Sequence, residues 1–163
     1  MESLDQNSSS APGVGHSFHG PIELYLDDAP VVDHRNRLTG RQIRELGVPD
    51  RIEGFETEEV DAQNHRLRLI GDDEEIEVRR EERFRTFVRI WLDGAPVCSY
   101  HHVLTGRQIR ELGPTDRVDG FETQKLDAHK KKERTIGDDE EVELHRGEHF
   151  RTVPNHGGPG GTV

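Results

Sequence analysis

The chain of 163 residues is only 30% hydrophobic and has a mean hydropathy of −0.88, which argues against one large core with a deep enzyme pocket and favours small domains with polar tails. Its formal net charge of −11 opposes binding to nucleic acids or to anionic membranes, because both require clustered cations. With a single cysteine, Cys98, and no run of the ~18 apolar residues that a membrane helix needs, a cytoplasmic protein is expected.

One unit of sequence occurs twice, at an offset of 66 residues and without insertions. The decapeptide LTGRQIRELG at 38–47 recurs at 104–113. Between 22–86 and 88–152, 36 of the 65 positions are identical. Two copies fall short of the roughly three that a solenoid needs to bury its faces, so each unit is expected to fold alone. The predicted organisation is a disordered tail over 1–20, a domain over 21–87, a second domain over 88–153 and a flexible glycine-rich tail over 154–163.

Each unit opens with a predicted β-hairpin. Ile22, Leu24 and Leu26 recur at every second position, which is the period of a half-buried strand. Asp27-Asp28 follows where a tight turn is needed, and the chain can return through residues 30–32. The second unit repeats this pattern, so both are predicted to begin with two antiparallel strands.

The repeated decapeptide predicts a short helix. Thr39 is a suitable N-cap, and Gln42 three residues later completes a capping box. Gly47 is expected to end the helix. Ile43 and Leu46 would then face the sheet.

Short strands are predicted after the helix, over 55–60, 67–70, 76–78 and 84–87. A sheet that carries one helix on one face is an α+β arrangement. In a unit of 65 residues with the helix after the first hairpin, this order is typical of a β-grasp. We therefore expect an α+β protein made of two tandem β-grasp (ubiquitin-like) domains.

Three motifs at fixed spacing give each unit a resemblance to the bacterial multi-ubiquitin domain. They are the decapeptide, the acidic segment IGDDEE at 70–75 and 136–141, and FRT at 84–86 and 150–152. The resemblance covers residues 22–86 and 88–152, and the two-unit layout is similar to that of the two-lobed interferon-induced modifier of animals. It implies a protein modifier rather than an enzyme.

The resemblance also implies the partners of the chain. They are a ThiF-like activating enzyme, a conjugating enzyme, a JAB-type metallopeptidase and the target proteins, often in anti-phage defence. ATP would be consumed by the activating enzyme, so no cofactor is expected on this chain.

The glycine-rich end contains two candidate conjugation sites, Gly157-Gly158 and Gly160-Gly161. Residues follow both pairs, so a processing cut is expected before either glycine can react. Cleavage after Gly158 is preferred, although Pro159 disfavours many peptidases because its nitrogen carries no hydrogen. The alternative is an unreactive tail on a non-covalent β-grasp adaptor. The junction FRTFVRI at 84–90 contains no glycine, so the two units are expected to stay joined.

Tyr25 and Trp91 occupy the same repeat position and, by strand alternation, should lie on the outer face of the sheet. Exposed aromatic residues often mark partner sites, so Trp91 is the first candidate for recognition. The alternative is that Trp91 packs between the domains.

Catalytic and metal sites are not expected. His145 with His149, and His101 with His102, lack the spacing of known metal motifs and suggest surface histidines. Residues 70–75 lack the ligand pattern of a calcium loop and predict an acidic turn. Cys98 aligns with Val32, which favours a small packed residue over a nucleophile.

Overall fold

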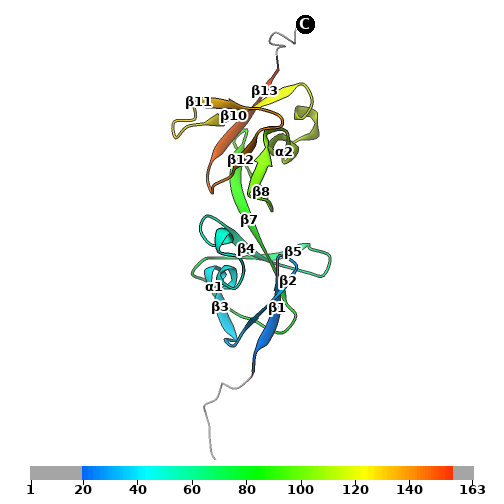
Figure 1. Ribbon diagram of the computed structural model, residues 1–163, viewed down its shortest axis with the longest axis vertical. Helices are drawn as coiled ribbons and strands as arrows, with labels where there is room; N and C mark the ends of the chain where they lie inside the picture. The colour runs from blue at the N-terminus through cyan, green and yellow to red at the C-terminus, as the bar shows by residue number, and fades with distance from the viewer. Residues whose placement is uncertain (1–19, 156–163) are drawn as a thin grey trace, which may run out of the picture.

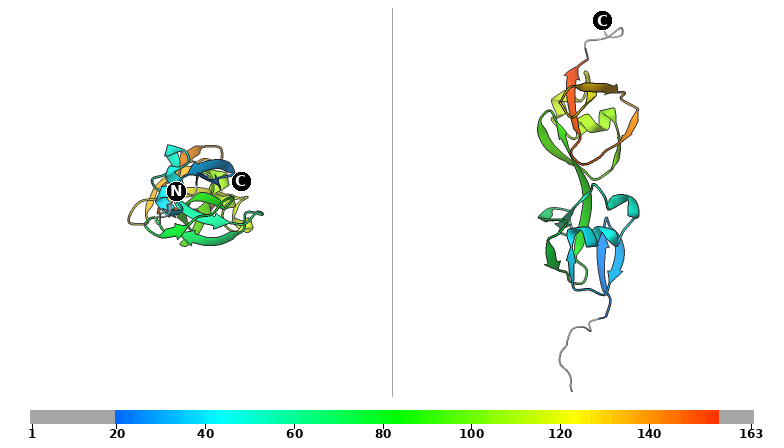
Figure 2. Two further views of the ribbon diagram at one scale, coloured as in Figure 1. Left: turned by 90° about the horizontal axis from the view of Figure 1, so that it is seen from below. Right: turned by 90° about the vertical axis from the view of Figure 1, so that its left-hand side faces the viewer.

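A computed structural model describes residues 20–155, which form an α+β structure made mostly of strands with few helices (Figure 1). The molecule is elongated. Two lobes, the first of residues 22–87 and the second of residues 88–155, lie end to end and are joined by one strand, β7 (Arg83–Leu92) (Figures 1 and 2). None of the helices in the described part of the chain has the length and apolar character needed to cross a bilayer.

The two lobes contain the same elements in the same order. In the first lobe they are β1 (Ile22–Leu26), β2 (Ala29–Asp33), β3 (Arg37–Thr39), α1 (Gly40–Glu45), a 3-10 helix (Pro49–Arg51), β4 (Glu56–Val60), β5 (Arg66–Ile70), β6 (Glu75–Glu77) and the first half of β7. In the second lobe they are the second half of β7, β8 (Ala95–Ser99), β9 (Val103–Thr105), α2 (Gly106–Glu111), a 3-10 helix (Thr115–Arg117), β10 (Phe121–Leu126), β11 (Lys132–Ile136), β12 (Glu141–Glu143) and β13 (His149–Pro154).

The strand order is the same in both lobes. In the first lobe it is β2-β1-β7-β4-β5, with β1 and β7 parallel and the other neighbours antiparallel. In the second lobe it is β8-β7-β13-β10-β11, with β7 and β13 parallel. Small antiparallel ladders, β3 with β6 and β9 with β12, complete the lobes.

Strand β7 belongs to both lobes, so the predicted domain boundary after residue 87 lies inside a strand. The sequence pattern indicated two strands at this place, one on each side of the boundary. They run on as one because residues 83–92 contain no glycine, proline or other turn residue. As a result the two lobes share one sheet of nine strands.

The predicted hairpins are present. One aspartate in each both forms the turn and binds the central strand through its carboxylate. Asp27 and Asp28 adopt positive φ angles of 52° and 67°, as the tight turns that favour hairpins require. The Asp27 carboxylate also accepts hydrogen bonds from the backbone nitrogen of Thr86, at 2.8 Å, and from its hydroxyl, at 2.7 Å. Asp93 and Thr152 repeat these contacts in the second lobe. The threonine of the FRT motif therefore fixes the turn to the central strand.

The predicted capping box is also present. Thr39 accepts a hydrogen bond from the Gln42 backbone nitrogen, and the Gln42 side chain accepts one from the Thr39 nitrogen. The helix ends before Gly47, as predicted, with Leu46 as its C-cap. Gly47 does not adopt a positive φ, so it does not form a left-handed cap. A Cβ at Gly47 would instead lie 2.7 Å from Leu26 Cδ2, so this glycine allows the helix end to approach the sheet closely.

Each lobe has its own apolar core. The first core consists of Ile22, Leu24, Leu26, Leu38, Ile43, Ile70, Ile76, Val78 and Phe84. The second consists of Phe55, Val88, Ile90, Leu92, Leu104, Ile109, Ile136, Leu144 and Phe150. Phe55 is the exception, since it belongs to the first lobe in sequence but packs in the core of the second. The lobes therefore contact each other through packed side chains as well as through β7.

Candidate functional site

The outer face of the second lobe carries an aromatic stack. Strands β7 and β13 run parallel with Trp91 opposite His149. Their rings stack with centroids 5.6 Å apart and an angle of 8° between the planes. Trp91 and His149 are therefore both half-buried. This differs from the sequence-based prediction that His149 is simply a surface histidine.

A shallow concavity of about 770 Å³ adjoins this stack. It is lined by Trp91, Asp93, Gly94, Leu126, Lys130, His149, Phe150 and Arg151. Aromatic and aliphatic surface with a few charged groups at its border is the usual composition of a recognition site. The concavity therefore makes the Trp91 face the best candidate for contact with a partner.

The pKa of His149 lies below its ordinary value of 6.5 because burial disfavours the charged ring and the Lys130 ammonium group repels it. The imidazole is thus held in its neutral form near pH 7. A neutral ring can stack on Trp91 without the cost of desolvating a charge.

The equivalent position of the first lobe has a different character. Tyr25 lies under the guanidinium group of Arg83, whose Cζ atom is 5.1 Å from the ring centroid. This is a cation–π contact, in contrast to the neutral stack of Trp91 and His149. Although Tyr25 and Trp91 share one repeat position, the two lobes thus present different surfaces to a partner.

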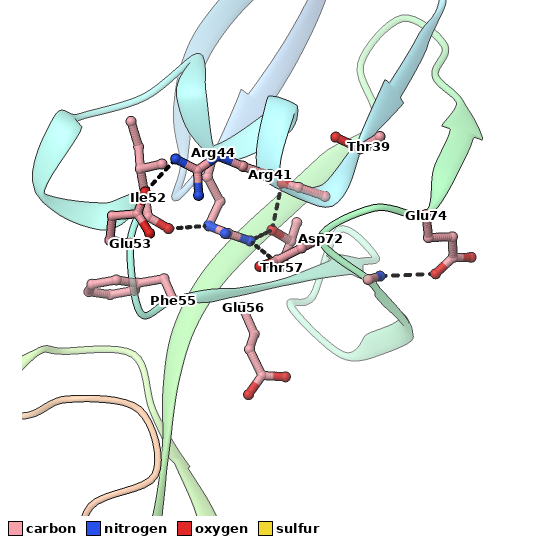
Figure 3. A network of polar contacts seen from close by, with 12 residues as sticks. Thr39, Arg41, Arg44, Ile52, Glu53, Phe55, Glu56, Thr57, Asp72 and Glu74 are labelled. Atoms are coloured by element: carbon pink, nitrogen blue, oxygen red, sulfur yellow. Dashed lines mark hydrogen bonds and ion pairs between the residues drawn. The ribbon is translucent and has the colours of Figure 1, made fainter.

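A buried arginine connects the helix to the acidic turn in each lobe. Figure 3 shows this network in the first lobe. Arg44 is 1% exposed and donates to the carbonyl of Ile52 at 2.9 Å, the hydroxyl of Thr57 at 3.0 Å and the carboxylate of Asp72 at 2.9 Å. Burial alone would raise the pKa of Asp72, but the hydrogen bond and charge of Arg44 outweigh it and lower that pKa. Arg110 makes the corresponding contacts in the second lobe.

The acidic segment 70–75 forms a turn. Asp72 pairs with Arg44, and Glu74 accepts a hydrogen bond from the Gly71 backbone nitrogen at 2.9 Å. The carboxylate of Asp72 thus ties the turn to the helix, and that of Glu74 stabilises the turn itself. Among residues 20–155 no group of three or more His, Cys, Asp or Glu side chains is placed to hold a metal ion.

A second buried charge lies where the lobes meet. Glu58 is fully buried and receives hydrogen bonds from Arg66 at 2.6 Å and from Arg85 at 3.2 Å. The Arg85 guanidinium also lies 3.7 Å from the ring centroid of Tyr100 in the second lobe. Burial and the Glu58 carboxylate raise the pKa of Tyr100. The buried Glu58 carboxylate is thus neutralised by two arginines, and this network stabilises the junction of the lobes.

The remaining sequence candidates are spread over the molecule. Cys98 is half-buried, with its sulfur 3.7 Å from an Arg66 nitrogen. His101 is exposed, whereas the ring of His102 packs edge-on against Phe55. His145 is exposed beside Glu148.

The glycines proposed for conjugation, Gly157, Gly158, Gly160 and Gly161, lie outside the described residues, as do residues 1–19. The last described contact is made by Asn155, whose backbone nitrogen donates to the carbonyl of Gly120 at 2.8 Å. Strand β13 therefore leads out of the second lobe at the end that faces away from the first (Figure 1).

Comparisons with the models of known protein families, with curated proteins and with solved structures gave no match.

Proposed function

We propose that this chain is a ubiquitin-like protein modifier, made of two β-grasp units and conjugated to target proteins in the bacterial cytoplasm. The observation that carries the proposal is the strand order of both lobes. Each has a hairpin, a capped helix, and a last strand that lies parallel to the first at the centre of the sheet. This arrangement suits a β-grasp, in which the chain leaves from a central strand.

The reactive group would be the carboxylate of Gly158, with Gly161 as the alternative. A JAB-type metallopeptidase would first hydrolyse the bond after Gly158. A ThiF-like enzyme would then join the carboxylate to AMP from ATP, with release of pyrophosphate, and transfer the acyl group to a cysteine thiol as AMP leaves. A conjugating enzyme would pass it to a target amine. The glycines contribute a narrow backbone, and the partners supply every catalytic group.

The Trp91 face would be the surface by which these partners recognise the modifier. Aromatic residues in partly desolvated pockets often contribute most of the binding energy of an interface. Trp91→Ala should therefore weaken conjugation, whereas Tyr25→Ala, at the equivalent position of the first lobe, should have a smaller effect. The resemblance to the multi-ubiquitin domain extends the proposal to anti-phage defence.

A second function is favoured by the same concavity, because it lies on folded strands and does not depend on the tail. In this alternative the chain is a non-covalent adaptor that binds partners through Trp91 and never reacts.

Co-expression of the chain with the three enzymes, followed by intact-mass measurement, separates the two functions. A modifier should lose residues 159–163 and then appear joined to larger proteins. Gly158→Ala should abolish conjugation and Gly161→Ala should not. The reverse pattern would move the reactive end to Gly161. If residues 159–163 remain on every molecule while the peptidase is active, the adaptor function is correct.

A further inference from the structure

The end of the first lobe that faces the second is an occupied docking surface. The Glu56 carboxylate accepts two hydrogen bonds from Arg89, each of 3.0 Å. The ring of Phe55 is only 4% exposed because His102 packs edge-on against it, with centroids 5.7 Å apart. Phe55 and Glu56 lie at the edge of the Arg44 network, on the side of the second lobe (Figure 3).

A second arginine of the second lobe completes this contact. Arg146 donates to the backbone carbonyl of Phe55 and lies 3.9 Å from the Asp72 carboxylate. The receiving surface thus offers a phenyl ring and two carboxylates. The surface that docks on it offers an imidazole ring and two guanidinium groups, so the charges are complementary.

The second lobe has the same receiving residues at its own far end. Phe121, Glu122 and Asp138 occupy the repeat positions of Phe55, Glu56 and Asp72. Asp138 is held by Arg110 at 2.9 Å, just as Asp72 is held by Arg44. Phe121 is only half-buried, whereas Phe55 is buried. Phe121 and Glu122 pair with Pro154 and Val153, the last residues of β13.

A second copy of this chain does not fit that surface. Its first lobe would present Glu23 where the second lobe presents Arg89, and Glu23 would face the carboxylate of Glu122. It would also present Asn36 in place of His102. The like charges and the lost ring disfavour end-to-end stacking of copies.

We propose that Phe121, Glu122 and Asp138 form a docking surface for a different protein, whose contacting face carries two arginines and an aromatic or imidazole ring. These are the same groups that the second lobe presents to the first, namely Arg89, Arg146 and His102. The surface does not depend on reaction of the tail, so its test involves no conjugation.

The probe is a chain in which residues 1–153 are followed directly by a third lobe. One graft carries residues 88–155 and presents Arg89, His102 and Arg146 to the surface. The matched control carries residues 22–89, has the same length and presents Glu23 and Asn36. Amide relaxation and residual dipolar couplings then report whether the third lobe shares the alignment of the second.

The 88–155 graft should align with the second lobe, and the 22–89 graft should reorient independently. The double change Phe121→Ala and Glu122→Ala in the 88–155 graft should release its third lobe. If that variant keeps the alignment, strand continuity alone orders the lobe and the proposal is wrong. It is equally wrong if the 88–155 graft reorients as freely as the control or leaves its third lobe unfolded.

Discussion

Arg89 donates two hydrogen bonds to Glu56 across the junction of the lobes, and both measure 3.0 Å. The repeat position of Arg89 in the first lobe holds Glu23, an exposed residue of opposite charge. The duplication is therefore asymmetric at this point. Only the second lobe has the residue needed to dock on its neighbour.

The first prediction concerns this pair. Arg89 and Glu56 are partly buried, with side chains 34% and 24% exposed, and their paired geometry should give a coupling of about 1 kcal/mol. A double-mutant cycle with Arg89→Ala and Glu56→Ala, followed by urea unfolding, measures it. The control cycle pairs Glu23→Ala with Glu56→Ala and should show no coupling. Equal coupling in both cycles would contradict a specific contact.

The second prediction compares two phenylalanines at one repeat position. Phe55→Ala should lower the free energy of unfolding by about 3 kcal/mol, because it leaves a cavity in the core of the second lobe. Phe121→Ala should cost far less, since this ring is half-buried at the end of the molecule. Urea unfolding of the two variants gives the comparison. Similar losses would mean that Phe55 does not depend on contact with the second lobe.

The third prediction concerns the buried arginine. Arg44→Met keeps much of the volume but removes the donors to Ile52, Thr57 and Asp72, which should cost about 2–3 kcal/mol because buried acceptors are left unpaired. Arg41→Met, on the exposed side of the same helix, should have little effect. Because Arg44 lowers the pKa of Asp72, the stability that this carboxylate contributes is present above its unfolded pKa and is lost as the pH falls through the folded pKa. Arg44→Met should weaken that part of the acid sensitivity.

The fourth prediction uses Trp91, the only tryptophan of the chain, as a reporter. Protonation of the stacked His149 should quench its fluorescence, with a midpoint below the ordinary histidine value of 6.5. The folded state binds a proton at His149 less readily than the unfolded state does. The stability that neutral His149 contributes is therefore fully present above pH 6.5 and is lost as the pH falls through the folded pKa. His149→Arg should remove the transition, whereas His145→Arg should keep it. A midpoint at or above the ordinary value would disprove the stacked, neutral ring.

Local features of the fold were predictable from the sequence. The capping box of Thr39 and Gln42 depends on residues that are close in the chain, so a short window contains the whole interaction. The position of the turn at Asp27-Asp28 was predictable from adjacent residues, whereas the contact of Asp27 with Thr86 was not. Strand alternation likewise placed Leu24 in the core and Tyr25 outside it. These predictions required no information about distant segments of the chain.

Contacts between distant segments were not predictable in this way. The burial of Arg44 depends on acceptors 8 to 28 residues away, and an arginine on a short helix usually faces water. The signal that was available is the recurrence of both Arg44 and Asp72 in the second unit. The stack of His149 on Trp91 required the parallel pairing of β7 with β13, which no local pattern gives. The continuous strand through the junction was also missed, although the absence of any turn residue from 84–90 pointed to it.

The shared strand β7 also imposes an order on synthesis. Each lobe has its central strand last in its own sequence, so the first lobe cannot close on the ribosome until residues 83–87 have emerged. The following residues already belong to the second lobe, but their parallel partner β13 comes 66 residues after the first half of β7. At about 5–20 residues per second this is a wait of roughly 3–13 seconds. During that interval the second half of β7 extends from the completed first lobe, and the second lobe then assembles on it.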